Sequence, residues 1–307
     1  MKNQKDNKLR RTGKAKLRGT DRIFNIILTI LVSIVMVVVL YPIIYVISSS
    51  FSSGEAVSSG RVFLCPVDLS LEGYQMIFSN KDVWTGYANS ILYAVVSTFT
   101  GVAMTVMIAY PLSRKEFQGK RFLDIYFLIL MFFSGGMIPT YVLMDKLGLV
   151  NNRIGFLIMT GGASLYNMVL TRTYFQNTIP KEMFEAAKMD GCDDFQYLFK
   201  ILLPLSKANL SVIALYALVA HWNSYMTPLI YLREASLKPL PVIVNEIIGN
   251  SSMNAGASIG TGMATQAANP EVMKYAIIVV SAVPMIIIYP IVQKFFDKGV
   301  MMGSLKG

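Results

Sequence analysis

The chain has 307 residues and a formal net charge of +10, and 54% of its residues are hydrophobic while only 15% are charged. A soluble domain cannot bury so much apolar surface, so this composition indicates a protein that crosses a membrane several times. The composition does not favour a nucleic-acid-binding protein, because the basic residues have no aromatic interleaving and no binding motif accompanies them. The two cysteines, Cys65 and Cys192, lack metal-site spacing. We therefore expect no bound metal.

Residues 1–22 form a basic N-terminal arm that contains nine Lys and Arg residues. The apolar run that follows has about 25 residues, whereas the core of a secretory signal peptide has roughly 7–15. We therefore interpret this run as the first membrane helix. The arm is expected to lie against anionic lipid headgroups.

Six apolar runs are long enough to cross a bilayer, which takes about 20 helical residues. They cover residues 23–48, 87–112, 122–144, 154–173, 206–231 and 273–296. The predicted fold class is an all-α polytopic membrane protein whose six transmembrane helices form one domain, residues 23–296. Gly135, Gly136 and Pro139 should break the third run, and the small residues 161–164 should let a neighbouring helix approach the fourth run closely.

The Lys and Arg residues lie mostly on one side of the predicted membrane. If the N-terminus is inside, 21 of the 28 fall in residues 1–22, 113–122, 172–207 and 294–307. The positive-inside rule then places both termini and the loop 174–205 in the cytoplasm. The loop 232–272 is expected outside, and its stretch 250–269 has the Gly, Ser, Ala and Asn content of a flexible segment.

The loop 174–205 contains the hydrophilic stretch EAAKMDGCDDFQYLFKILLP at residues 185–204. Pro180 suits the first turn of a helix over residues 180–190. Gly191 suits the left-handed residue that ends such a helix. A second short helix is predicted from Asp193 to Ile201, after which Pro204 should restart the chain as the fifth membrane helix.

A helix as short as 180–190 is marginal alone in water. We therefore predict that it docks on a partner, with Ala186 and Ala187 as a low-profile face and Glu185 paired with a basic residue there. The alternative interpretation is an amphipathic helix that lies on the membrane surface.

The spacing of the loop residues resembles the EAA loop of bacterial ABC-importer permeases: Glu185-Ala186-Ala187, then Gly191, Ile201, Leu203 and Pro204. Other short runs are similar to the carbohydrate-uptake branch of that family, namely Asn89-Ser90, Met137-Ile138-Pro139-Thr140, residues 146–151, Trp222-Asn223, Pro228-Leu229 and the tail from Lys298 to Gly307. The chain looks like the second, six-helix permease of maltose-type importers, within the lipoprotein and aldouronate group.

This resemblance implies a non-catalytic permease subunit that moves an oligosaccharide across the bacterial plasma membrane by alternating access. The implied partners are a second permease subunit in a heterodimer, two cytoplasmic ABC ATPase subunits and an extracellular solute-binding lipoprotein. This chain has no GxxxxGK[ST] loop of its own, so it should bind no cofactor, and ATP and Mg would sit on the partner ATPase.

The resemblance also implies roles for particular residues. Contact with the ATPase is assigned to Glu185, Ala186, Ala187, Gly191, Leu203 and Pro204. The tail residues Gly303, Ser304, Leu305 and Lys306 resemble a segment that reaches between the two ATPases, with a frayed terminus as the alternative. The stretch 250–269 lies where relatives insert a loop into the binding protein, and a plain flexible connector is the alternative there.

Polar side chains inside a membrane are costly and usually face a cavity or another helix. The candidates for a sugar-binding cavity are Ser90, Asn167, His221, Asn223 and Tyr225, each with helix packing as the alternative. Asn and Tyr suit sugars through hydroxyl hydrogen bonds and ring stacking. The predicted membrane cores contain no central Lys or Arg, so this subunit should not neutralise an acidic sugar.

Other functions need features that the sequence lacks or leaves open. An importer permease for a peptide, an amino acid or phosphate is the alternative function. A membrane enzyme needs paired acids, a Ser/His arrangement or metal ligands, whereas this chain has one histidine and one near-membrane acid, Asp124, which should pair with a nearby Arg or Lys. No catalytic residue is therefore predicted. A stand-alone channel or secondary transporter commonly shows internal repeats or buried charge relays, and neither is found.

Overall fold

The computed structural model describes the backbone of residues 19–249 and 270–304, and the side chains of residues 23–249 and 271–290. Within these ranges the regular elements are helices, joined by turns and one isolated bridge between Ser52 and Leu69. Three single helices are long and apolar enough to cross a membrane, and three bent helix pairs raise the number of spans to as many as six. The predicted all-α, six-span fold class is confirmed. Most of the arm 1–22, the stretch 250–269 and the tail residues Leu305 and Lys306 lie outside the described residues.

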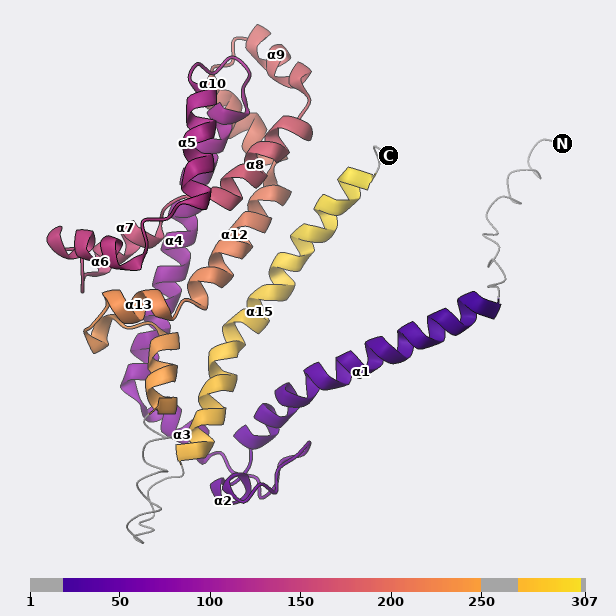
Figure 1. Ribbon diagram of the computed structural model, residues 1–307, viewed down its shortest axis with the longest axis vertical. Coiled ribbons are helices and arrows are strands. Elements are labelled where there is room, and N and C mark those ends of the chain that lie inside the picture. Colours follow the sequence, from indigo (N-terminus) through magenta and orange to yellow (C-terminus); the bar gives the residue numbers. More distant parts are fainter. Residues whose placement is uncertain (1–18, 250–269, 305–307) are drawn as a thin grey trace.

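The first helix, α1 (Gly19–Ser50), diverges from the rest of the bundle, as Figure 1 shows in indigo. Its apolar side chains are exposed along most of its length, as expected for a span that lipid surrounds. Only its last residues are held: Ser48, Ser49 and Ser50 are buried, and the Ser50 hydroxyl lies 2.8 Å from the Tyr74 hydroxyl of α3 (Glu72–Ser79). The short α2 (Gly54–Ser58) follows at this end.

The helix α4 (Lys81–Ser113) runs through the centre of the bundle (Figure 1), where α12 (Lys207–Trp222) and α8 (Leu165–Asn177) pack against it. The last helix, α15 (Pro270–Ser304), packs against α12, α1 and α3. Interhelical hydrogen bonds add to the apolar packing. The Ser97 and Thr160 hydroxyls are 2.7 Å apart, and Asn209 Nδ2 donates to Thr171 Oγ1 at 3.2 Å. Such bonds satisfy polar groups that lipid cannot.

The third span is broken where the sequence predicts. The helices α5 (Lys120–Phe132) and α6 (Met137–Lys146) meet at 109°. Between them, Gly136 has φ +80°, a left-handed conformation that a side chain would strain. The predicted break at Gly135 and Gly136 is confirmed.

The fourth span was predicted as one helix, which is wrong. It consists of α7 (Arg153–Thr160) and α8, bent by 45° at residues 161–164. Ser164 starts α8 by accepting a hydrogen bond from Asn167 N at 3.5 Å, which is the role of an N-cap residue. The predicted close approach is confirmed, because a Cβ added to Gly161 would lie 2.4 Å from Thr100 Oγ1 of α4.

The fifth span, predicted as continuous over 206–231, is also broken. The helix α12 ends at Trp222, and α13 (Met226–Tyr231) begins after Asn223, Ser224 and Tyr225. Pro228 supplies the reason, because in a continuous helix its ring would clash with the carbonyl of Ser224. A 3₁₀ turn (Ala235–Leu237) and the helix Leu240–Gly249 follow.

Asp124 of α5 forms an ion pair with Arg172 of α8. The two guanidinium Nη atoms lie 2.5 and 3.0 Å from the two carboxylate oxygens. This bidentate geometry is the strong form of the interaction. The prediction that Asp124 pairs with a nearby basic residue is confirmed.

The contact between Gly161 and α4 generates a matched test. Gly161→Ala should lower the midpoint of thermal unfolding in detergent, because overpacking a tight contact costs about 1–3 kcal/mol. Gly162→Ala is the control, since an added Cβ there would have no atom within 4 Å. Equal midpoints for the two variants would contradict the close contact.

Candidate functional site

The first half of the EAA loop is the helix α9 (Lys181–Met189), with Pro180 as its N-cap. It ends at Gly191, whose φ is +78°. The chain reverses there: Gly191 N donates to Lys188 O at 3.1 Å, and Cys192 N donates to Ala187 O at 3.0 Å. These bonds satisfy the last carbonyls of the helix. The predicted helix and its glycine stop are confirmed, with bounds that differ by one residue.

The second half begins with Asp193, whose Oδ1 accepts a hydrogen bond from Gln196 N at 2.7 Å. It contains α10 (Asp194–Gln196), a π-helical turn (Tyr197–Leu202) and α11 (Leu203–Leu205). The predicted second helix is confirmed, but the prediction that Pro204 starts the fifth span is wrong. Leu203 and Pro204 belong to α11, and the chain turns by 80° before α12 starts at Lys207.

Burial separates the residues of the EAA motif into two groups. Ala187 is only 7% exposed and packs in a cluster with Leu112 of α4, Phe175 of α8 and Tyr197. It therefore cannot belong to an outward docking face, which corrects the expectation for this residue. Because successive helical residues differ by about 100° in direction, Glu185 and Ala186 point elsewhere and are exposed.

The loop also has large apolar side chains that are exposed. Met189 is 88% exposed, Phe195 75% and Phe199 63%. Large apolar groups exposed in a hydrophilic loop are typical of a protein contact. The loop thus has one face packed on the bundle and one face available to a partner.

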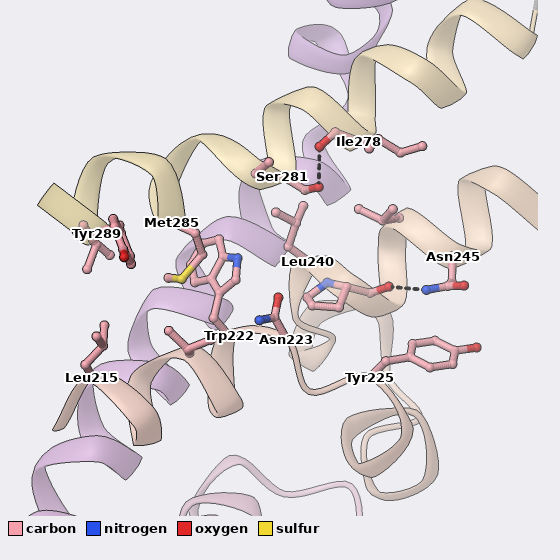
Figure 2. Close-up of a pocket in the computed structure, with 15 residues that line it drawn as sticks. Leu215, Trp222, Asn223, Tyr225, Leu240, Asn245, Ile278, Ser281, Met285 and Tyr289 are labelled. Carbon is pink, nitrogen blue, oxygen red and sulfur yellow. Dashed lines mark hydrogen bonds between the residues drawn. The ribbon is translucent and has the colours of Figure 1, made fainter. Parts of the chain in front are cut away.

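A cavity of about 550 Å³ lies between α12, the helix Leu240–Gly249 and α15 (Figure 2). Two predicted residues, Asn223 and Tyr225, line it together with Trp222. The sequence analysis missed its other polar side chains, Asn245, Ser281 and Tyr289. Ser281 and Tyr289 could have been found from the sequence, because they are polar residues within the predicted sixth span. Asn245 falls in the predicted outer loop, where a polar residue gives no such signal.

A second cavity, of about 430 Å³, lies between α4, α8 and α12. The predicted residues Asn167 and His221 line it, with Thr105, Tyr166 and Tyr216. Neither cavity has Asp, Glu, Lys or Arg among its lining residues. Both are therefore suited to uncharged, hydroxyl-bearing groups.

Ser90 lines neither of these cavities, which corrects its inclusion among the candidates. Its hydroxyl accepts a hydrogen bond from Leu240 N at 2.8 Å. The neighbouring Asn89 donates to the carbonyls of Ser236 and Lys238 at 2.9 and 3.1 Å. Both side chains attach the segment 236–240 to α4. Of the predicted tail residues, Gly303 and Ser304 end α15, and no contact of the tail falls within the described side chains.

Comparison with known proteins identifies the family. Residues 14–302 match the model for the binding-protein-dependent transport system inner membrane component. The chain belongs to this family. It is therefore a non-catalytic membrane subunit of a transporter, as predicted.

Three similar proteins cover most of this chain. The polygalacturonan/rhamnogalacturonan transport system permease protein YtcP of Bacillus subtilis is 35% identical over 85% of this chain and 91% of its own length. Protein LplC of the same organism is 31% identical over 85% of this chain and 88% of its own length. The crystal structure of a bacterial ABC transporter involved in the import of the acidic polysaccharide alginate has a chain that is 40% identical, with a TM-score of 0.82, over 91% of this chain and 98% of that one.

Gly191 permits a test that depends on backbone conformation alone, since a Cβ added there would meet no atom within 4 Å. Gly191→Val should reduce ATP-driven uptake by proteoliposomes several-fold, because a left-handed conformation costs a non-glycine residue about 1–2 kcal/mol. Gly191→Asn should retain most uptake, because Asn tolerates this conformation. The same uptake by both variants would contradict the role of the turn.

Proposed function

We propose that this chain is the permease subunit of an ATP-driven ABC importer that translocates an oligosaccharide by alternating access. The observation that carries the proposal is the folded EAA loop: α9 is packed on the bundle through Ala187 and presents Glu185, Ala186 and Met189 outward. Membership of a binding-protein-dependent transport family supports it.

The proposed partners are a second permease subunit, two ATPase subunits that bind ATP and Mg, and an extracellular solute-binding lipoprotein. We place both termini and the EAA loop in the cytoplasm, following the distribution of Lys and Arg. The proposed ATPase contacts are Glu185, Ala186, Gly191, Leu203 and Pro204 on the loop, with Gly303, Ser304, Leu305 and Lys306 in the tail. Ala187 supports the loop from within.

The packing of the loop indicates how motion would reach the membrane helices. Tyr197, Leu198 and Leu202 share a buried cluster with Val106, Ala109 and Leu112 of α4. The same loop continues through Ser206 into α12, which lines both cavities. A displacement of α9 by ATP-driven closure of the ATPases would therefore act on α4 and α12 together. ATP supplies the difference in free energy between the two states that such a switch needs.

Several relatives support a sugar as the solute. They include permeases named for polygalacturonan/rhamnogalacturonan and for arabinooligosaccharides, and the alginate importer. Within the larger cavity, Trp222, Tyr225 and Tyr289 offer rings, and Asn223 and Asn245 offer amides. Since both cavities lack charged lining residues, the second permease or the binding protein would have to neutralise an acidic sugar.

Docking on the ATPase is tested by placing a bulky, charged side chain on the face of α9 that is proposed to contact the ATPase. Ala186→Arg should abolish co-purification of the ATPase with this chain. A groove of the ATPase that fits an alanine would be overfilled by the long, charged arginine side chain. Ala235→Arg is the matched control, an exposed alanine in the segment that we place outside. ATPase retained by Ala186→Arg, or lost equally from Ala235→Arg, would contradict the proposed interface.

The sugar-binding role of the larger cavity is tested with Asn223, which is exposed and has no side-chain hydrogen bond in the described part of the chain. Asn223→Ala should raise the KM for uptake about tenfold, the loss expected for one good hydrogen bond to a sugar hydroxyl. Uptake would be measured in proteoliposomes with oligogalacturonates, alginate oligosaccharides and arabinooligosaccharides. Unchanged KM for every transported sugar would remove Asn223 from the site, and uptake of none of the three would contradict the substrate class.

A further inference from the structure

A third cavity, of about 290 Å³, lies beside the EAA loop. Its walls come from the connection between α4 and α5, the end of α8 and the start of α9. Four of its lining residues are cationic, namely Arg114, Lys115, Lys120 and Lys181, and no Asp or Glu lines it. The volume is many times the roughly 15 Å³ that admits one water molecule, so a polyatomic anion fits.

The centre of this cluster is Arg114, whose guanidinium is held by three aromatic rings. Its Cζ atom lies 3.8 Å from the ring centroid of Phe184, 4.7 Å from that of Tyr197 and 4.8 Å from that of Tyr110. Its Nε is buried and has no hydrogen-bond partner among the residues that the structure describes. Cation–π contacts lower the cost of burying this charge, but they do not replace a paired anion.

The nearby carboxylates do not neutralise the four cations. Asp194 accepts a hydrogen bond from the Tyr110 hydroxyl at 3.2 Å, and Glu116 and Glu182 are exposed. Ion pairs in the described part of the chain involve none of the four cations. Lys120 Nζ donates instead to Arg114 O at 3.2 Å, and Gln176 Nε2 donates to Leu112 O and Ser113 O at 3.4 Å. These bonds fix the walls, and within the described residues no ion pair neutralises any of the four cations.

We propose that this cavity binds a phosphate group, either of an anionic phospholipid headgroup or of a small soluble phosphate ester. Arg and Lys clusters are the usual ligands of phosphate oxygens. Basic pockets between membrane helices on the cytoplasmic side bind anionic headgroups, and we place this cavity on that side. Because Phe184 of α9 stacks on Arg114, phosphate bound here strengthens the attachment of α9 to α4.

Binding is measured on the delipidated full-length chain by native mass spectrometry and by thermal shift. The probes are phosphatidylglycerol, inorganic phosphate and glycerol phosphate, with phosphatidylcholine as the control, whose zwitterionic headgroup has a phosphate but no net charge. Lys115→Gln with Lys181→Gln should weaken binding of the anionic probe at least tenfold, because each cation near the surface contributes to attraction of anionic groups. In the part of the chain that the structure describes, neither lysine side chain forms a hydrogen bond or an ion pair.

Lys200→Gln with Lys207→Gln is the control, because both lysines are exposed, Lys200 in the EAA loop and Lys207 at the start of α12, and neither lines the cavity. Binding of phosphatidylglycerol alone supports the lipid source, and binding of the soluble phosphates alone supports the ester. Binding of no anionic probe, equal binding of phosphatidylcholine, or an equal loss in the control pair would overturn the proposal. The binding assay needs no ATPase or sugar, so its failure leaves the transport function untouched.

Discussion

The burial of Ala187 and Tyr197 against α4 and α8 makes the EAA loop a rigid part of the membrane domain. Tyr197 is 1% exposed, and its ring meets that of Phe184 edge-on at a centroid separation of 5.0 Å. A helix of nine residues has little stability of its own in water, so this packing is what keeps α9 folded. It also fixes the direction of the exposed face. A loop that was only tethered could bind an ATPase but could not pass on a displacement.

The broken spans provide the other half of the proposed mechanism. Backbone breaks at membrane depth are tolerated only where protein or a cavity satisfies the freed groups. Here the break at residues 161–164 borders the cavity of about 430 Å³, and the break after Trp222 borders the cavity of about 550 Å³. These cavities have no charged lining residues, so in the proposed importer the partners would have to recognise the charge of an acidic sugar. The cationic cluster lies instead beside the EAA loop.

Much of the fold was predictable because its signals are local. Long apolar runs fix the spans, Gly136 fixes one break, and Gly191 and Asp193 fix the ends of the loop helices. The incorrect predictions for Ser90 and Ala187 concern tertiary contacts. The role of Ser90 depends on Leu240, which is 150 positions away, and the burial of Ala187 depends on Phe175 and Leu112. The break near Pro228 had a local signal, a proline in a predicted helix, which the length of the apolar run outweighed.

The most direct measurement is photo-crosslinking from single positions in the assembled importer in its native membrane. A photo-reactive amino acid at Met189, which is 88% exposed on the EAA loop, should yield an adduct with the ATPase. The same group at Leu69, which is 81% exposed on the side that we place outside, should yield none. An adduct from Met189 alone would establish that the loop is the ATPase-docking surface. No ATPase adduct from Met189, or one from Leu69, would contradict the proposed coupling.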